Sequence, residues 1–138
     1  MNVTGELRYY LGGEYATLRY TETRSSMSID IVLVPAPHRG QGIGSGLIAR
    51  VLLLADLTQR PVFVDARPIG TSGEAALERL VTYYQSFGFE ETGRGLTVVH
   101  MRRPAAADPA AVADGARRIL EPRRVSVAPE ATKGARSR

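Results

Sequence analysis

Four glycines stand at alternate positions in the segment 39–47, which reads R-G-Q-G-I-G-S-G-L. An apolar run, residues 28–34, precedes this segment, and a stretch with helical periodicity follows it. Glycine has no Cβ atom, so the backbone can turn sharply there and a ligand can approach the amide N–H groups closely. The first turn of a helix adds unpaired N–H donors and a positive partial charge. The segment therefore predicts a cradle for a phosphate or pyrophosphate group.

Two common nucleotide-binding motifs do not fit this segment. A mononucleotide P-loop ends in Gly-Lys followed by Ser or Thr, whereas Gly44 is followed by Ser45 and Gly46, and no lysine occurs before Lys133. The dinucleotide pattern G-x-G-x-x-G needs a glycine at position 45 or 47, and these positions hold serine and leucine. Hydrolysis of ATP or GTP and binding of nicotinamide or flavin cofactors are therefore disfavoured.

Asp30 lies in the middle of the apolar run S-I-D-I-V-L-V, which reads as a strand. Side chains alternate between the two faces of a strand, and the apolar face here consists of Ile29, Ile31 and Leu33. The opposite face is expected to carry Asp30 together with Ser28, Val32 and Val34. An acid in this place is a candidate general base. The other interpretation is a solvated strand face or a salt bridge to an arginine.

Asp65 and His38 are weaker candidates for the same role. His38 directly precedes the glycine segment and is expected at the surface. His100 lies in the late run V-V-H-M, which reads as a strand, and is expected to pack or pair there.

The sequence before the glycine segment contains three short β-type runs, at 6–10, 15–20 and 27–34. Gly12-Gly13 and the polar stretch 21–26 separate them, which predicts an antiparallel meander. Pro35 and Pro37 end the third run, because proline cannot donate a hydrogen bond to a strand ladder.

After the glycine segment, residues 47–57 carry apolar side chains at helical spacing and predict a helix whose apolar face lies against the sheet. The run V-F-V-D-A, residues 62–66, reads as a short strand. The order strand, helix, strand predicts a βαβ crossover with a parallel pair. The predicted fold class is therefore mixed α/β (α+β), with a mostly antiparallel sheet, a central parallel pair and two main helices.

A second helix is expected from Ser72 to Phe87. Ser72 is a good N-cap, Glu74 adds an acid in the first turn, and Gly88 suits the C-terminus. The expected buried stripe of this helix consists of Leu77, Leu80, Val81 and Tyr84. The remaining sequence reads as a hairpin with strands at 89–91 and 96–102.

Composition narrows the function classes. The chain has 138 residues, of which 43% are apolar and 23% charged, as expected for one globular domain. It has no cysteine, which excludes disulfides, thiolate metal sites and a cysteine nucleophile. No apolar run approaches the roughly 20 residues of a membrane span, and the N-terminus lacks a signal pattern, so a cytoplasmic location without a membrane partner is expected.

From Pro104 the composition shifts to Ala, Pro, Arg and Asp. We therefore expect one domain at 1–103 and a tail at 104–138, with a short helix at 109–121 and disorder elsewhere in the tail. The net charge is +1 in residues 1–103 and +3 in the tail.

Two motifs lead to a family resemblance. The glycine segment matches R-x-x-G-x-G at Arg39, Gly42 and Gly44, and the stretch L-V-T-Y-Y-Q-S-F-G-F at residues 80–89 places Tyr84 four residues before Gly-Phe. Together they resemble the motifs of the GCN5-related N-acetyltransferases, the GNAT family, and their order around the short strand agrees with that family's layout. The compact chain is similar to small phage-encoded and bacterial acetyltransferases.

The resemblance implies an acyl-CoA-dependent N-acetyltransferase that uses acetyl-CoA and no metal. In the family the glycine loop binds the pyrophosphate, and the edge of a strand that splays from its parallel neighbour binds the pantetheine. The implied CoA-binding residues are Val32, Val34, Arg39, Gly40, Gln41, Gly42, Ile43, Gly44, Ser45 and Tyr84. The resemblance further implies that Tyr84 is the general acid for the departing thiolate and that Asp30 is the base that withdraws the amine's proton.

The chain departs from the family between its first two strands. The family usually places two helices there, and they help to wall the acceptor site, whereas only residues 11–14 separate the two runs here. The acceptor side is therefore expected to be open. An open site favours a protein lysine or another bulky acceptor, or a homodimer partner that supplies the missing wall.

The competing class is a binding module, either a catalytically inactive CoA-binding domain or a basic-tailed adaptor. The tail lacks interleaved aromatic residues and its charge is modest, so nucleic-acid binding is not favoured. A different acyl donor, such as succinyl-CoA, is a third alternative. The identity of the acceptor cannot be read from the chain.

Overall fold

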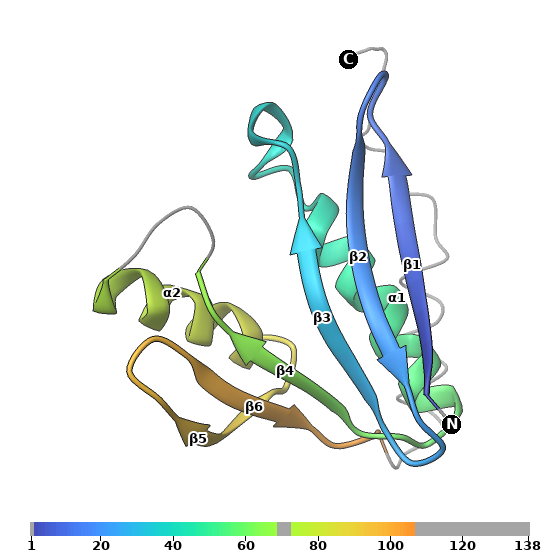
Figure 1. The fold of residues 1–138 in the computed structure, drawn as a ribbon, viewed down its shortest axis with the longest axis vertical. Coiled ribbons are helices and arrows are strands. Elements are labelled where there is room, and N and C mark those ends of the chain that lie inside the picture. The colour runs from blue at the N-terminus through green and yellow to red at the C-terminus, as the bar shows by residue number, and fades with distance from the viewer. Residues whose placement is uncertain (1, 69–72, 107–138) are drawn as a thin grey trace.

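The computed structural model describes residues 2–68 and 73–106, which form a six-stranded sheet with two α-helices packed on it. The strands lie in the order β1-β2-β3-β4-β6-β5 (Figure 1). The elements are β1 (Val3–Tyr10), β2 (Tyr15–Glu22), β3 (Met27–Leu33), η1 (Ala36–His38), α1 (Ile43–Leu57), β4 (Val62–Ala66), α2 (Glu74–Gln85), β5 (Glu90–Arg94) and β6 (Val99–Arg103). Neighbouring strands are antiparallel except β3 and β4, which are parallel. The predicted fold class is confirmed.

A tight turn joins β1 to β2, and no helix intervenes. The backbone N–H of Leu11 donates to the carbonyl of Glu14 over 2.8 Å, and Gly12 and Gly13 between them have φ values of 77° and 136°. Glycine reaches such positive φ angles without the steric cost of a Cβ atom. The predicted direct connection of the first two strands is confirmed.

Helix α1 begins at Ile43, four residues before the predicted start at Leu47. Gly44 and Gly46 therefore lie in its first turn and not in a loop, which corrects the prediction. Glycine disfavours a helix interior by up to about 1 kcal/mol. A Cβ atom on Gly44 would lie 3.5 Å from Val34 and 3.6 Å from Val32, which is ordinary van der Waals contact, so packing against β3 does not by itself require glycine here.

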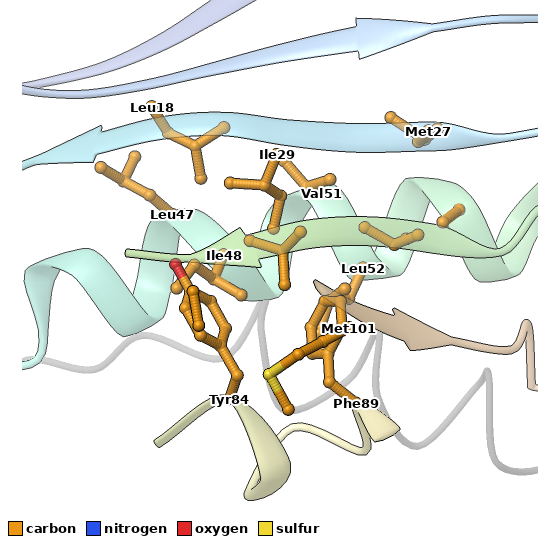
Figure 2. Close-up of a cluster of buried hydrophobic side chains, with 14 of the residues drawn as sticks. Leu18, Met27, Ile29, Leu47, Ile48, Val51, Leu52, Tyr84, Phe89 and Met101 are labelled. Carbon is orange, nitrogen blue, oxygen red and sulfur yellow. The ribbon is translucent and has the colours of Figure 1, made fainter. Parts of the chain in front are cut away.

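One hydrophobic cluster joins both helices to the same face of the sheet (Figure 2). Helix α1 passes behind β1, β2 and β3 in Figure 1 and contacts all three strands. Helix α2 packs against β4 and adds Leu77, Val81 and Tyr84 to the cluster, which confirms the predicted stripe apart from Leu80, which is only partly buried. The largest fully buried side chains are Phe89, Leu18, Met27, Ile48, Met101, Val62 and Val99.

The opposite face of the sheet is not covered by a helix in the part of the chain that the structure describes. Along β4 the side chains of Val62, Val64 and Ala66 are buried, whereas Phe63 and Asp65 are exposed. We call this second face the open face. The strand registers and side-chain contacts place on it Thr21, Ser28, Asp30, Phe63, Asp65, His100 and Arg102.

A β-bulge at Asp30 changes which side chains share a face of β3. Arg19 pairs with Ile31 and Tyr20 with Ile29, so Asp30 is the extra residue of the strand. Beyond it the alternation shifts by one position, and Val32 lies opposite the buried Leu18.

The predicted face of Asp30 was therefore wrong in part. Val32 and Val34 face α1, as their approach to Gly44 shows, and they do not share a face with Asp30. Ile31 and Leu33, opposite Arg19 and Thr17 of β2, lie on the open face instead. Strict alternation cannot reveal a bulge, because an inserted residue leaves no signature in hydrophobicity.

The C-terminal elements differ in their bounds from the prediction. Helix α2 ends at Gln85, and Gly88 behind it has a φ of 97°, as the predicted helix end requires. The two hairpin strands start at Glu90 and Val99, later than predicted. The later start of β6 has a clear cause, because Gly95 N–H donates to the carbonyl of Val98 and Leu96 is therefore part of the turn.

Helix α2 begins at Glu74 with Gly73 in the N-cap position, which corrects the predicted start and N-cap at Ser72. Most of the tail and its predicted helix at 109–121 lie outside the described residues. Within the described ranges no helix is long and apolar enough to cross a membrane.

Candidate active site

The parallel strands β3 and β4 pair over only three residues each and then separate. Met27, Ser28 and Ile29 pair with Val62, Phe63 and Val64, and beyond these positions the two strands diverge (Figure 1). A cavity of about 1060 Å³ opens in the gap, lined by residues of β3, the start of α1, β4 and α2. Divergence of parallel strands is a common place for ligands in α/β sheets.

The predicted site residues meet at this cavity with one exception. Asp30, Val32, Val34, Arg39 and Tyr84 line it, together with Gly40, Gly42, Ile43, Gly44 and Ser45. Gln41 is exposed and does not line it. Residues that lie far apart in the sequence thus surround one space.

The start of α1 lines the cavity at the place where the sequence predicts the anion cradle. Gly42 has a φ of 81° in the N-cap position, and the first helical hydrogen bond runs from Gly46 N–H to the Gly42 carbonyl over 3.0 Å. In the described ranges no protein acceptor takes the backbone N–H groups of Ile43, Gly44 or Ser45. Three unpaired donors at a helix N-terminus suit a phosphate oxygen.

Arg39 supports the loop. Its Nε atom donates to the carbonyl of Val34 over 2.9 Å, which ties the loop to the end of β3. One edge of the guanidinium is thereby committed to the protein. The backbone amides at the helix start, more than this side chain, define the cradle.

The edge of β3 that faces the cavity has no strand partner beyond Ile29. Its opposite edge pairs with β2 as far as Leu33, so the backbone of residues 30–34 is extended and held in place. An extended ligand can hydrogen-bond such an edge as an added strand would. Val32 and Val34 line the cavity along this edge.

Tyr84 is buried at the wall of the cavity, with 7% of its surface exposed. Its ring packs edge-on against Phe89, and its hydroxyl is directed away from α2, towards α1 and β4 (Figure 2). No hydrogen bond to this hydroxyl occurs among the residues that the structure describes. Burial and the neighbouring Tyr83 raise the pKa of Tyr84 to about 12. The group therefore keeps its proton at neutral pH and is an unpartnered donor beside the cavity.

Tyr83 is a cavity residue that the sequence did not single out. Its hydroxyl lies 2.7 Å from Ser45 Oγ, which connects α2 to the glycine cradle. Its position next to Tyr84 was the available signal, but the helical pattern alone gave it no role. Phe63, Arg67, Arg79 and Leu80 also line the cavity and were not predicted.

The carboxylate of Asp30 is oriented by two hydroxyl groups on the open face. Thr21 Oγ1 donates to Oδ2 over 2.6 Å and Ser28 Oγ donates to Oδ1 over 3.0 Å. The weaker candidates also have partners: His100 Nδ1 lies 2.7 Å from Asp65 Oδ1, and His38 Nε2 lies 3.6 Å from Glu14. The expectation that His100 would pair is confirmed.

No cluster of three or more His, Cys, Asp or Glu side chains suited to a metal ion is found in residues 2–68 and 73–106. The polar groups at the cavity are backbone N–H donors, hydroxyls, guanidinium groups and separate carboxylates. This set suits an anionic ligand with an extended chain.

Comparisons with known proteins agree with this geometry. No family model and no curated protein sequence matches the chain. Solved structures do match: the anti-CRISPR protein AcrVA5 is 30% identical, and the match covers 71% of this chain and 97% of that protein with a TM-score of 0.54. The chain belongs to the GNAT family. Two further GNAT-fold structures match with lower identity.

An acyl-CoA N-acyltransferase from Pseudomonas aeruginosa is 24% identical, with a TM-score of 0.58 and coverage of 72% of this chain and 68% of that one. A GNAT-family protein from Desulfovibrio desulfuricans is 18% identical, with a TM-score of 0.59 and coverage of 75% and 70%. GNAT proteins are acyl-CoA-dependent N-acyltransferases, and relatives in the family use acetyl-CoA as donor. Because AcrVA5 is matched over nearly its whole length, the compact form of this GNAT protein is not peculiar to it.

Proposed function

We propose that this GNAT protein transfers an acetyl group from acetyl-CoA to a primary amine, and that a protein lysine or another bulky acceptor is preferred to a small amine. One observation carries the proposal. The anion cradle, the unpaired strand edge and the buried Tyr84 hydroxyl all face one cavity between β3 and β4. These are the groups that an acyl-CoA and its departing thiolate require.

The donor is proposed to bind in the cavity in an extended form. The N–H groups of Ile43, Gly44 and Ser45 are proposed to bind the pyrophosphate, and the edge of β3 at Val32 and Val34 the pantetheine. Acetyl-CoA supplies an activated thioester. The protein has to hold it, polarise its carbonyl and deliver a proton to the leaving sulfur.

Tyr84 is the proposed proton donor. It lines the cavity, its hydroxyl has no protein acceptor among the described residues, and its raised pKa of about 12 keeps it protonated. A developing thiolate is a stronger base than a neutral thioester sulfur, so the hydrogen bond strengthens as the C–S bond breaks. Asp30 remains the proposed carboxylate for the acceptor amine, since it lines the cavity from the open face.

The open face supports a bulky acceptor. Phe63 is 40% exposed and Leu33 is 44% exposed on this face, and no helix covers them in the described ranges. Within the described ranges, therefore, no helix stands between the cavity mouth and an approaching macromolecular surface. A homodimer, in which a second copy supplies that wall, and a cytoplasmic location both remain predictions.

The proposal is tested by incubating the full chain with acetyl-CoA and three probes: poly-L-lysine, a single-lysine peptide and spermidine. Released thiol is measured with a thiol-reactive dye, and acetylated product by mass spectrometry. The chain has no cysteine, so every thiol detected comes from CoA. We expect transfer to the two lysine probes and less to spermidine.

The inactive CoA-binding module predicts a different result. Calorimetry would then show that CoA binds, while no thiol is released with any amine. Transfer to spermidine alone would contradict the proposed preference for a bulky acceptor but would support the acetyltransferase activity.

A further inference from the structure

Asp65 and His100 make a close contact on the open face, and neither residue has a role in the reaction proposed above. His100 Nδ1 lies 2.7 Å from Asp65 Oδ1, and the register of β4 and β6 sets the two residues directly opposite each other. Both side chains are about half exposed, and Asp65 lines the cavity. A carboxylate that holds one ring nitrogen of a histidine leaves the other nitrogen free to accept a proton.

The contact determines which imidazole nitrogen is free. Asp65 Oδ1 accepts a hydrogen bond from Nδ1–H, so the neutral ring carries its lone pair on Nε2. In the described part of the chain no hydrogen bond involves Nε2 of His100. A carboxylate that orients a histidine base in this way also stabilises the imidazolium that forms, as in Ser-His-Asp hydrolases.

Asp30 is placed for a different task. Both of its oxygens already accept a hydrogen bond, from Thr21 and from Ser28. The register of β3 and β4 ends at Ile29 and Val64, and the next residue on each strand is an aspartate. Asp30 and Asp65 therefore follow the last strand pair on the two sides of the cavity mouth. A fixed carboxylate at this mouth attracts an ammonium group.

We propose that the Asp65–His100 pair receives the proton that the acceptor ammonium gives up, while Asp30 holds that ammonium at the mouth. The inference rests on the proposed acetyl transfer. An N–H bond of R–NH₃⁺ breaks, and the proton passes through water at the open face to His100 Nε2, which becomes an imidazolium beside the Asp65 carboxylate.

The remaining steps balance the atoms and protons. The neutral amine forms the C–N bond to the acetyl carbon, the C–S bond breaks, and the sulfur takes the hydroxyl proton of Tyr84. The nitrogen's second surplus proton restores Tyr84 through solvent. The products are the acetylated amine, CoA thiol and one proton on His100.

The charged groups around His100 come from three strands. Asp65 lies opposite on β4, Arg102 lies two residues along β6, and β5 places Glu90 opposite Arg102. Arg67 follows β4 and lines the cavity. Asp65 is the charged side chain for which a contact with the imidazole is observed, so it is the group whose removal should affect His100 most.

The experiment compares kcat/KM for acetyl transfer to poly-L-lysine in the wild type, His100→Gln and Asp65→Asn between about pH 5.5 and 9. We expect kcat/KM at neutral pH to fall about 100-fold in His100→Gln. In this variant kcat/KM should rise with pH over the whole range in proportion to the neutral form of the lysine, whereas the wild type, in which the imidazole takes the proton, should depend less steeply on pH. Asp65→Asn should also lower kcat/KM, because the amide no longer selects the Nδ1–H tautomer.

Glu6→Gln is the control, because it also removes a charge but lies on β1, pairs with Arg8 and Arg19 and does not line the cavity. It should keep the dependence of kcat/KM on pH that the wild type shows. A readout apart from activity is the nitrogen spectrum of the imidazole by NMR, in which the wild type should show the Nδ1–H tautomer of His100 and Asp65→Asn a mixture. The calorimetric Kd for CoA should stay within about twofold in both test variants, since neither residue belongs to the cradle.

The failures can be told apart. An active wild type whose pH profile survives in His100→Gln, or a His100 ring protonated on Nε2 alone, overturns this inference and leaves the acetyltransferase proposal intact. A wild type that binds CoA and acetylates no probe overturns both. Loss of CoA binding in His100→Gln would assign the residue to folding or donor binding and would also overturn the inference.

Discussion

Two adjacent tyrosines on α2 have opposite surroundings, and this difference separates their expected roles. Tyr84 is buried with an unpartnered hydroxyl in the described ranges, whereas Tyr83 is 36% exposed and hydrogen-bonds Ser45. A proton donor must be held and kept dry, while a group that braces the phosphate cradle can be partly hydrated. Burial and hydrogen bonding thus distinguish two side chains of the same type.

Tyr84→Phe should lower kcat by about 10²-fold or more, because the departing thiolate loses its proton donor, while the Kd for CoA stays nearly unchanged. Tyr83→Phe should weaken CoA binding by about 1 kcal/mol with a smaller effect on kcat, because Ser45 loses its partner. Steady-state kinetics and calorimetry on both variants measure the difference. Unchanged turnover in Tyr84→Phe would remove Tyr84 from the mechanism.

The raised pKa of Tyr84 also predicts how stability depends on pH. The folded protein holds this proton up to about pH 12, whereas an unfolded tyrosine loses it near pH 10. The stabilisation is therefore fully present below about pH 10 and is lost as the pH rises through about 12. Urea unfolding at several alkaline pH values should show a loss in the wild type that exceeds the loss in Tyr84→Phe. Parallel losses in the two proteins would contradict the assignment.

At the scale of elements, α1 has two different parts. Its first turn contains glycines that leave the amides accessible to a ligand, and the following turns carry Leu47, Ile48 and Val51 into the core. The packing of the later turns holds the proposed cradle in place.

Gly44→Val should abolish measurable CoA binding by calorimetry, since the new side chain would occupy the space between the helix start, Val32 and Val34. Gly42→Val should do the same and should also destabilise the fold, because the φ of 81° disfavours a β-branched residue. Gly46→Ala is the control. A Cβ atom there meets nothing within 4 Å, so CoA binding should persist and stability should rise by about 0.5–1 kcal/mol. Retained affinity in Gly44→Val would refute the cradle.

At the scale of the whole molecule, one ion pair joins the end of α1 to the last strand. Both guanidinium ends of Arg103 donate to Asp56, over 2.8 and 3.0 Å, and Asp56 also accepts from the amide of Ala106. Arg103 Nε donates to the carbonyl of Phe87. Asp56 is 8% exposed, so the pair is a nearly buried link among α1, the segment after α2 and β6.

Arg103→Met should destabilise the fold by about 3–5 kcal/mol, because it leaves a buried carboxylate without its partner. Burial raises the pKa of Asp56, and the hydrogen bonds from Arg103 and Ala106 more than offset this effect, so the pKa lies below its ordinary value. The stabilisation is present above about pH 4 and is lost as the pH falls through the folded pKa. Urea unfolding at neutral and at acidic pH should show the difference from the wild type shrinking in acid.

Glu6→Gln is the control for this ion pair, since it removes the exposed pair with Arg8 and should change stability by less than about 1 kcal/mol. If the Arg103→Met variant were as stable as the wild type, packing alone would hold these elements together.

Local pattern in the sequence was enough to predict most elements, the parallel crossover, the absence of helices between β1 and β2, and the family. These features depend on neighbours in the chain: glycine spacing, helical period, turn residues and the Tyr84 to Gly88-Phe89 motif. The start of α1 was predicted too late, because the low helix propensity of glycine argues against a first turn that contains Gly44 and Gly46. The hairpin strands were misplaced because a two-residue turn competes with strand pattern at Leu96.

Only the tertiary structure decided how the open face is arranged. The bulge at Asp30 depends on the pairing of β3 with β2, and the Asp65–His100 contact joins residues 35 positions apart. A sequence pattern records which side chains alternate along one strand, but it does not record register between strands. The sequence by itself therefore predicted the proposed donor site, most of which lies within one strand, loop and helix, whereas the pairing of separate strands arranges the proposed acceptor side.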